Sequence, residues 1–564
     1  MPPILFALIG INSRFDYVIG KRQVLCYAFS RSPRRTMRMK TKEALMTPNL
    51  SVCGCCPMSR RSFLEKSGTT CAAALGAWAI PRVFGASSPA DRLRIRIVYV
   101  LFGAKQPRPT WPHIGYDFVP VMNRLEAALA NQCPEFEFVT SMASTEEEAG
   151  KILKEDETTR VDGYLAIQMN NWPRVVQTLA ASGKPVLYAD FTYAGTGGFL
   201  TYNAALLRMR STNVGFVSSS EPQDLIDAVK CFEVVRQGLP AVEFVAATSR
   251  SREQRTPKAG DRDRAADPLR CLPIADCVNR LKESKILAIR DQKGGPATEI
   301  MGIPVVYVPF AELNDLAQTA SRDEARDWAD RWEKGAQRIE GVPRETIEKS
   351  AAMYLGQKAL MKKHGANAIT INCLGGFYGN HISAYPCLGF CQLVDDGLVG
   401  ACECDVRSTA TMVAITTLTQ GRPGYISDPV MDTSKREIIY AHCVAPTKVF
   451  GPTGPANPYQ ILTHSEDRQG ASIRSILPTG YLTTSLQFEP KRKEILFHQA
   501  MAVGNDSNDR ACRTKLRAQP LGDFEKLFTM WDVWGWHRVT FYGDLQEPVA
   551  ALADAVGWKV VTET

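Results

Sequence analysis

Short apolar runs alternate with helix-length segments from residue 94 to residue 374, and this alternation restricts the fold more than any other feature. Apolar runs of four to eight residues between helical segments are typical of βαβ units, whose strands are parallel and are covered by helices. The first series predicts one doubly wound, Rossmann-like α/β domain over residues 91–210. Its strand-like runs are 94–103, 136–142, 161–169 and 184–190, and its helix-like segments are 117–131, 145–157 and 172–182.

A second series of the same kind begins near Asn213. It predicts a second doubly wound α/β domain over residues 211–395, because it repeats the order of strand, helix and strand. The strands are expected at 213–219, 285–291, 303–310 and 367–374, and the helices at 221–237, 297–301, 311–338 and 343–364.

The pattern of apolar and turn-forming residues changes after about residue 395. Short β-like runs separated by Gly and Pro turns dominate from there to the C-terminus, where residues 546–556 have the pattern of a helix. Many short strands with turns between them indicate a barrel or a sandwich. Residues 396–564 therefore predict a mostly β, barrel-like third domain.

The positive charge of the chain is concentrated at its N-terminal end. The formal net charge is +8, but residues 1–57 hold nine Lys and Arg against two acidic residues, and residues 58–86 hold four against one. The rest of the chain, after residue 86, is slightly acidic. It has no excess positive charge that would bind a polyanion, so no nucleic-acid partner is expected. No run of 18 apolar residues occurs, so no stable membrane span is expected either.

Residues 58–90 have the pattern of a twin-arginine export signal. Arg60 and Arg61 precede a short, moderately apolar stretch from Thr69 to Ile80, and small residues follow at 85–88. A charged head, a short apolar middle and a small-residue exit define such a signal. We expect residues 1–57 to be a non-native or disordered extension before a start at Met58, and the protein to be periplasmic or otherwise exported.

The cysteines give no sign of a disulfide framework or of a zinc site. Eleven lie downstream of Ser87, and an odd number cannot pair completely within one chain. No paired CxxC motif is present there, as a structural zinc site would require. We expect these residues to be buried free thiols.

The segment from Gly400 to Ala410 is the first candidate site. A run of mostly apolar residues precedes Glu403 and Asp405, and a helix-like run of small residues follows them. On a strand, residues i and i+2 face the same side, so the two carboxylates would project together at the carboxyl end of a strand, where open α/β sheets bind ligands. Paired carboxylates suit divalent metal binding and proton transfer. The alternative is that Asp405 is simply the N-cap of the helix.

The second candidate site lies in the segment from Trp534 to Asp544. His537 follows Trp536 and precedes Tyr542, and the chain has only seven histidines. Aromatic rings stack on sugar rings, and neutral imidazole is a common metal ligand. A core histidine is the alternative interpretation.

The two segments together resemble the L-fucose isomerase family and the wider L-fucose/L-arabinose isomerase superfamily. Glu403-Cys-Asp405 is similar to the family's Glu-x-Asp segment, and His537-x4-Tyr-Gly-Asp is similar to its C-terminal His…Tyr-Gly-Asp segment. The resemblance implies two α/β domains followed by a β-rich domain. It also implies a divalent ion, usually manganese, held by a Glu a few tens of residues before an Asp, by that Asp, and by the C-terminal His.

Carried over, Asp405 and His537 fit two of these ligands, with Glu403 as the expected third ahead of Asn372 or His381. The resemblance further implies an enzyme that interconverts an aldose and a ketose of a monosaccharide through a metal-stabilised enediol, with Asp405 and Glu403 as catalytic residues; together with the signal pattern, this predicts an exported isomerase. Asn372, His381, His442 and Trp536 are the expected substrate-binding residues. A homo-oligomer is also expected. The alternatives are a non-catalytic carbohydrate-binding protein with the same fold and a periplasmic solute-binding protein.

Overall fold

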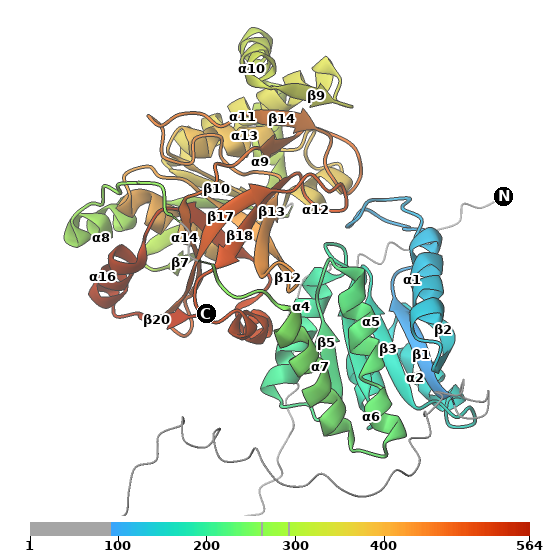
Figure 1. Cartoon of the computed structure of the whole chain (residues 1–564). Helices are drawn as coiled ribbons and strands as arrows, with labels where there is room; N and C mark the ends of the chain where they lie inside the picture. The colour runs from blue at the N-terminus through green and yellow to red at the C-terminus, as the bar shows by residue number, and fades with distance from the viewer. Residues whose placement is uncertain (1–91, 261–262, 292–293) are drawn as a thin grey trace, which may run out of the picture. The chain divides into compact units, whose positions relative to one another are not determined.

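The computed structural model describes residues 92–564, with gaps at 261–262 and 292–293 (Figure 1). The expected N-terminal extension and twin-arginine segment lie outside these residues, so export stays a prediction. Within the described part, no helix is both long and apolar enough to cross a membrane.

The first α/β domain is a five-stranded parallel sheet with the strand order β2-β1-β3-β4-β5. Its two faces have separate apolar cores, as a doubly wound fold requires. One core joins the sheet to α1, α5 and α7, and the other joins it to α2, α3 and α4. The elements are β1 (Leu93–Val100), α1 (Val119–Gln132), β2 (Phe136–Ala143), α2 (Glu146–Glu155), β3 (Gly163–Gln168), α3 (Val175–Ala180), β4 (Val186–Asp190), α4 (Thr196–Arg208), β5 (Val214–Val217), α5 (Pro222–Lys230), α6 (Glu233–Arg236) and α7 (Ala241–Arg255).

The strand near Asn213 completes this first sheet and does not begin the second. β5 pairs in parallel with β4, with Val186 opposite Val214, and the amide of Val186 donates to the carbonyl oxygen of Asn213. The α/β pattern itself gives no sign of which sheet a strand joins, because the strands of both sheets are short and apolar.

The second α/β domain is built on a five-stranded sheet with the order β11-β10-β6-β8-β7, in which β7 is the antiparallel edge. Helices α9, α11 and α13 pack on one face, and α8 and α14 pack on the other. The elements are α8 (Ile274–Glu283), β6 (Ile286–Ile289), β7 (Gly295–Ile300), β8 (Ile303–Val308), α9 (Phe310–Gln318), α10 (Arg322–Gly335), α11 (Arg344–His364), β10 (Ala368–Ile371), α12 (Cys373–Tyr378), α13 (Cys387–Asp395), β11 (Val399–Ala401) and α14 (Val406–Leu418).

Three details of this domain differ from the expectation. Residues 297–301 are not a helix, because Met301 and Gly302 both have positive φ and turn the chain into a β7–β8 hairpin. The helix expected over 311–338 is divided into α9 and α10, where Ser321 caps α10 by accepting from the amide of Glu324. The sheet also continues past residue 395, since β11 pairs with β10.

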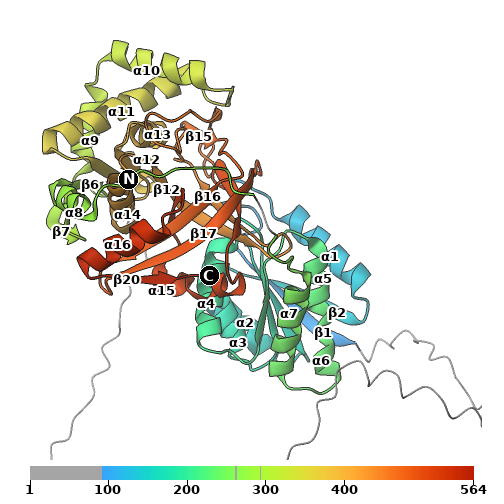
Figure 2. The ribbon, with the colours of Figure 1, turned by 60° about the vertical axis from the view of Figure 1, so that its left-hand side comes forward.

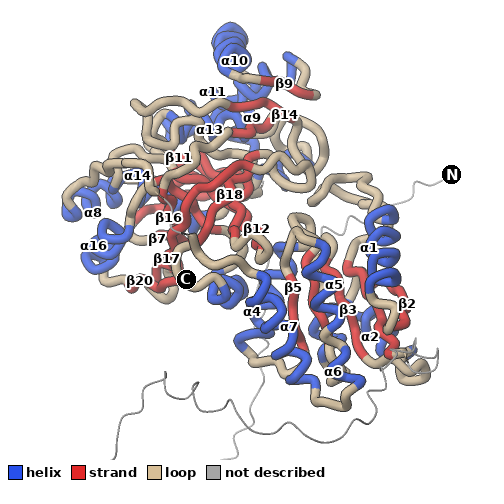
Figure 3. The backbone as a smooth tube through the Cα atoms, viewed as in Figure 1, coloured by secondary structure: helices blue, strands red, loops and turns tan. Residues whose placement is uncertain are grey.

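The C-terminal part contains a closed, six-stranded antiparallel barrel, in agreement with the barrel-like prediction (Figure 2). Its order is β16-β19-β12-β13-β18-β17, and pairing between β16 and β17 closes it. β20 adds in parallel to β17. The strands, red in Figure 3, are β12 (Gly424–Asp432), β13 (Glu437–His442), β16 (Leu482–Glu489), β17 (Glu494–Asn505), β18 (Thr514–Pro520), β19 (Arg538–Tyr542) and β20 (Lys559–Thr562).

The remaining elements are connections and a small fourth sheet. A three-stranded sheet with the order β15-β14-β9 links the connection after α10 to the segment after β13. The helix expected over 546–556 is observed with those bounds. These elements are β9 (Arg338–Glu340), β14 (Tyr459–Leu462), β15 (Ser472–Ser475), a 3-10 helix (Glu525–Thr529), α15 (Trp531–Trp534) and α16 (Gln546–Val556).

A buried network of charges ties the chain end to the barrel. Glu563, directly after β20, accepts from the guanidinium of Arg538, with Nη2 to Oε1 at 2.6 Å, and from Nδ1 of His498 at 2.8 Å. Nε2 of His498 lies 2.6 Å from the hydroxyl of Tyr440. Burial opposes the charge of Glu563, but Arg538 and His498 outweigh it and lower the pKa of Glu563 to about 2.

We expect Glu563→Gln to lower the free energy of unfolding by about 3–5 kcal/mol, because it leaves the buried charge of Arg538 without a partner. Since the folded-state pKa of Glu563 is below that of the unfolded chain, this stabilisation is present above about pH 5 and is lost as the pH falls towards 2. Urea denaturation between pH 3 and pH 7 measures both effects. Glu345→Gln, at an exposed pair with Lys349, is the control; an equal loss in both variants would contradict the prediction.

Candidate metal and active site

A sharp turn at the carboxyl edge of the second sheet presents Glu403. β11 ends at Ala401, and Glu403 and Cys404 both have positive φ, of 62° and 53°. The turn is held by a hydrogen bond from the amide of Cys404 to the carbonyl oxygen of Ile371. Two consecutive non-glycine residues in the left-handed region are uncommon and are typical of functional sites. The expected reason for the pairing of Glu403 and Asp405 is therefore wrong: they follow the strand and are placed by a turn.

Asp405 has two structural tasks at once. Its Oδ1 caps α14 by accepting from the amides of Arg407 and Ser408, both at 3.0 Å. Its Oδ2 accepts from the hydroxyl of Ser408 at 2.7 Å and lies 2.9 Å from Nδ1 of His537. The N-cap and the contact with His537, considered as alternatives from the sequence, are both present.

Three neighbouring strands of the barrel bring the other site residues to one place. In β12, Asp428 lies opposite Ala441 of β13, which directly precedes His442. On its other side, Ser427 lies opposite Arg538 of β19, which directly follows His537. The antiparallel register therefore places Asp428 between the two histidines.

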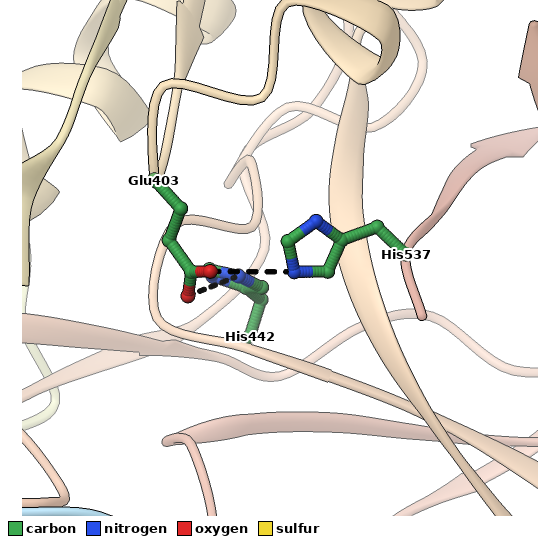
Figure 4. Close-up of side chains that lie close together, drawn as sticks. All are labelled: Glu403, His442 and His537. Carbon is green, nitrogen blue, oxygen red and sulfur yellow. Dashed lines mark ion pairs between the residues drawn. The ribbon is translucent and has the colours of Figure 1, made fainter. Parts of the chain in front are cut away.

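The rings of His442 and His537 converge on the carboxylate of Glu403 (Figure 4). Nε2 of His537 lies 3.3 Å from Oδ1 of Asp428 and 3.5 Å from Oε2 of Glu403. Nε2 of His442 lies 3.8 Å from Oδ2 of Asp428 and 4.0 Å from Oε1 of Glu403. One ligand atom from each of Glu403, His442 and His537 lies within 4.8 Å of the others, an arrangement that could hold a metal ion.

His442 is the most informative residue of this group. Its side chain is 2% exposed, and neither ring nitrogen has a hydrogen-bond partner within the described part of the chain. A buried polar atom without a partner costs about 1–3 kcal/mol, so a histidine in this position calls for an explanation. A metal ion between Nε2 and the two carboxylates provides one.

Nδ1 of His537 is held by a carboxylate, as is common for the second ring nitrogen of metal-binding histidines. Because Nδ1 faces Asp405, Nε2 is left to point at Glu403 and Asp428; such carboxylate–histidine pairs orient ligands in metal sites. Burial disfavours the imidazolium, but the three carboxylates outweigh it and raise the pKa of His537 above its ordinary value. Burial also opposes the charge of Asp405, and His537, Arg407 and Ser408 nevertheless lower the pKa of this carboxyl.

A further carboxylate, Glu466, lies beside the group. Burial raises the pKa of Glu466 to about 7, and the charges of Glu403 and Asp428 add to this while His464 opposes it. The hydroxyl of Tyr378 donates to Oε2 of Glu466 at 3.3 Å. Acidic groups are thus concentrated at this end of the barrel. Glu403 is the accessible member, with 34% of its side chain exposed against 7% for Asp428.

Asn372, His381 and Trp536, which were also expected at the site, are not among the four residues that converge. Asn372 caps α12 by accepting from the amide of Gly375, and His381 stacks on Phe310 with ring centroids 5.4 Å apart. Trp536 packs edge-on against Trp172 of the first domain, with 5.9 Å between ring centroids. Their roles in substrate binding stay predictions.

Asp428 is the residue that the sequence analysis missed, and His442 was expected only to bind substrate. The signal for Asp428 was present in the resemblance, which implies a Glu a few tens of residues before an Asp. Glu403 followed by Asp428 has this spacing, whereas Asp405, taken as that Asp, has no suitable Glu before it. In the structure Asp405 lies behind His537, and the residues that face a common point are Glu403, Asp428, His442 and His537.

The chain is similar to several sulfoquinovose isomerases, and no family model matches it. The protein from Priestia aryabhattai is 28% identical over 186 residues, covering 31% of this chain and 42% of that protein. The protein from Clostridium sp. strain MSTE9 is 26% identical over 265 residues, covering 45% and 57%. The alignments thus span about half the length of these relatives. The transcription regulator CcpA of Lactococcus lactis matches at 11% identity over 50% of this chain and 78% of its own, with a TM-score of 0.13, too low to inform the fold.

We expect His442→Leu to leave the stability of the metal-free protein unchanged or higher, because the replacement removes two buried nitrogens that have no hydrogen bond. Mn²⁺ should raise the Tm of the wild type and have no effect on this variant. Thermal unfolding after chelation, with and without MnCl₂, measures both effects.

His498→Leu is the matched control for His442→Leu. The ring of His498 is bonded on both sides, to Glu563 and Tyr440, so this variant should lose stability but keep the response to Mn²⁺. A response to Mn²⁺ in His442→Leu equal to that of the wild type would remove His442 from the site.

Proposed function

We propose that the protein is a sugar isomerase that interconverts the aldose and ketose forms of a monosaccharide with the help of a divalent ion. The observation that carries this proposal is the convergence of two carboxylates and two histidine Nε2 atoms, with His442 buried and lacking hydrogen bonds. Imidazole nitrogens and carboxylate oxygens are ligands of ions such as Mn²⁺ and Zn²⁺. The similarity to sulfoquinovose isomerases supports the reaction class.

The residues present fit a divalent ion. Glu403, Asp428, His442 and His537 would hold it, with Asp405 fixing the ring of His537 from behind. When bound, such an ion supplies positive charge that stabilises the negative charge developing on the oxygens of an enediol. We infer manganese from the family resemblance, and the donor set is compatible with it.

The chain's own residues supply the proton chemistry of this proposal. Aldose–ketose interconversion moves one proton between C1 and C2 of the sugar and another between their oxygens. Glu403 is the most accessible carboxylate of the group, so it takes and returns the carbon-bound proton, while Asp428 stays buried between the histidines. A carboxylate in hydrogen-bond reach of the reacting carbon typically contributes a factor of about 10²–10⁴ to such a step.

The relatives' name suggests the first substrate to try. Sulfoquinovose is a hexose with a sulfonate group, and we propose a monosaccharide of this kind as a candidate, beside neutral aldoses. A carbohydrate-binding protein without activity is the alternative, and turnover separates the two.

We expect the wild type with Mn²⁺ to convert an aldose into its ketose and to introduce solvent deuterium at C1 of the ketose, the carbon that receives the proton. Glu403→Gln should lower kcat by a factor of at least about 10², because the amide cannot accept that proton. NMR in ²H₂O, with sulfoquinovose and neutral aldoses as substrates, measures exchange and turnover together. The control Glu340→Gln, at an exposed pair with Arg338, should keep full activity; a sugar that binds without exchange in the metal-loaded wild type would favour the binding protein.

We expect Asp405→Asn to weaken the binding of Mn²⁺ by a factor of about 10–100, since the carboxylate orients His537 without meeting the ion itself. Saturating Mn²⁺ should then restore most of kcat, as a positioning role predicts. Competition with a chromogenic chelator measures the affinity. Ser408→Ala, which removes one contact of the cap but leaves His537 on Asp405, should change the affinity little; complete loss of Mn²⁺ binding in Asp405→Asn would instead make Asp405 a ligand.

A further inference from the structure

A small cavity beside strands β15, β17 and β18 has two positively charged side chains in its wall. Its volume is about 90 Å³, and none of the four residues that converge at the metal site lines it. The lining residues are Arg474, Ser475, Ile476, Asn505, Asp506, Ser507 and Lys515.

Lys515 is the deeper of the two cations. It is 1% exposed, and its ammonium donates to the carbonyl oxygen of Cys512 at 2.7 Å, a neutral acceptor. Burial lowers the pKa of Lys515 to about 8, and the charge of Arg474 is the second cause. Buried charges are normally paired with an opposite charge, so the surroundings of Lys515 disfavour its positive charge.

Arg474 is likewise bonded to neutral oxygens. It donates to the carbonyl oxygens of Arg513 at 3.1 Å and Ser507 at 3.5 Å, and to the side-chain oxygen of Gln460 at 3.3 Å. Burial and the charge of Arg513 both lower its pKa. Two cations that repel one another thus lie at one cavity, and both retain N–H groups beyond those bonds.

The one carboxylate in the lining, Asp506, does not neutralise this pair. One of its oxygens accepts from the hydroxyl of Tyr193 and the other from the amide of Asn508 at 2.7 Å. Its charge favours the ammonium of Lys515, yet burial and Arg474 outweigh it. Counting Arg474, Lys515 and Asp506, the lining has a net charge of about +1 at neutral pH.

We propose that this cavity binds a small tetrahedral oxyanion, such as sulfate, phosphate or a sulfonate group, between Arg474 and Lys515. An anion there would pair both cations and remove their mutual repulsion, through the charge-assisted hydrogen bonds that guanidinium and ammonium groups form with such ions. The exposed Ser507 marks the open side through which the ion enters.

The oxyanion pocket is independent of the proposed isomerase reaction. Its lining residues belong to β15, β17, β18 and the segments next to them, and include none of Glu403, Asp428, His442 and His537. Sulfate binding therefore does not depend on whether these four residues hold a metal ion.

Binding of radioactive sulfate to the full-length chain at pH 7, measured by equilibrium dialysis, tests the proposal. The wild type should bind about one sulfate per chain, and Lys515→Met should lower the affinity at least tenfold. Lys448→Met is the matched control, because Lys448 also donates to a carbonyl oxygen, that of Pro452 at 3.1 Å, but lies outside the pocket. The affinity of this variant for sulfate should equal that of the wild type.

Ser507→Asp is the second variant, since it changes only an exposed residue and places a negative charge at the rim. It should also weaken sulfate binding at least tenfold while leaving the Tm near that of the wild type. Glu403→Gln should bind sulfate normally even if the metal site fails. The proposal would be overturned if the wild type bound no stoichiometric sulfate, or if Lys515→Met and Ser507→Asp both bound sulfate with the affinity of the wild type.

Two probes distinguish the source of the oxyanion. Competition by unlabelled phosphate but not by methanesulfonate indicates a free inorganic ion, whose four oxygens are all enclosed. Competition by methanesulfonate as well indicates that the pocket receives the sulfonate or phosphate group of a larger molecule. Both results support an oxyanion pocket, and competition by chloride at the same ionic strength contradicts it.

Discussion

The contact between Asp405 and His537 is the interaction on which the arrangement of the site depends. Asp405 ends the turn after β11 and begins α14, so its position is fixed by the second α/β domain. His537 belongs to the barrel, directly before β19. One carboxylate thus sets both the start of a helix and the orientation of an imidazole from another part of the fold, and Nε2 of His537 points to Glu403 and Asp428 as a result.

Much of the fold could be predicted from the sequence, because periodicity is a local property. The parallel strands of both α/β sheets, the long helix α11 and the terminal helix α16 follow their hydrophobic patterns closely. The errors concern which sheet a strand belongs to and where the chain turns. β5 joined the first sheet because of its pairing with β4, which is a long-range property. The hairpin at Met301 and Gly302 depends on two positive φ angles that no apolar pattern reveals.

The candidate site could be predicted only in part, for a similar reason. Glu403, Asp405 and His537 stood out as polar residues in apolar or aromatic surroundings, and the structure brings all three together. Asp428 and His442 lie within apolar barrel strands that are brought together by the long-range pairing of β12 with β13, and only the distance of 3.8 Å between Oδ2 of Asp428 and Nε2 of His442 shows that they meet. The left-handed turn at Glu403 is equally invisible to a rule based on strand alternation.

The division of the four converging residues between two parts of the fold has a thermodynamic consequence. Glu403 is attached to the α/β sheet, whereas Asp428, His442 and His537 are attached to the barrel. An ion that engages both sets gains its full affinity only when the two parts are docked, so its binding free energy adds to their cohesion and to neither part alone. If the proposed ion binds, the concentration of free metal controls how cooperatively the α/β domain and the barrel unfold, and chelation separates unfolding transitions that coincide in the metal-loaded protein.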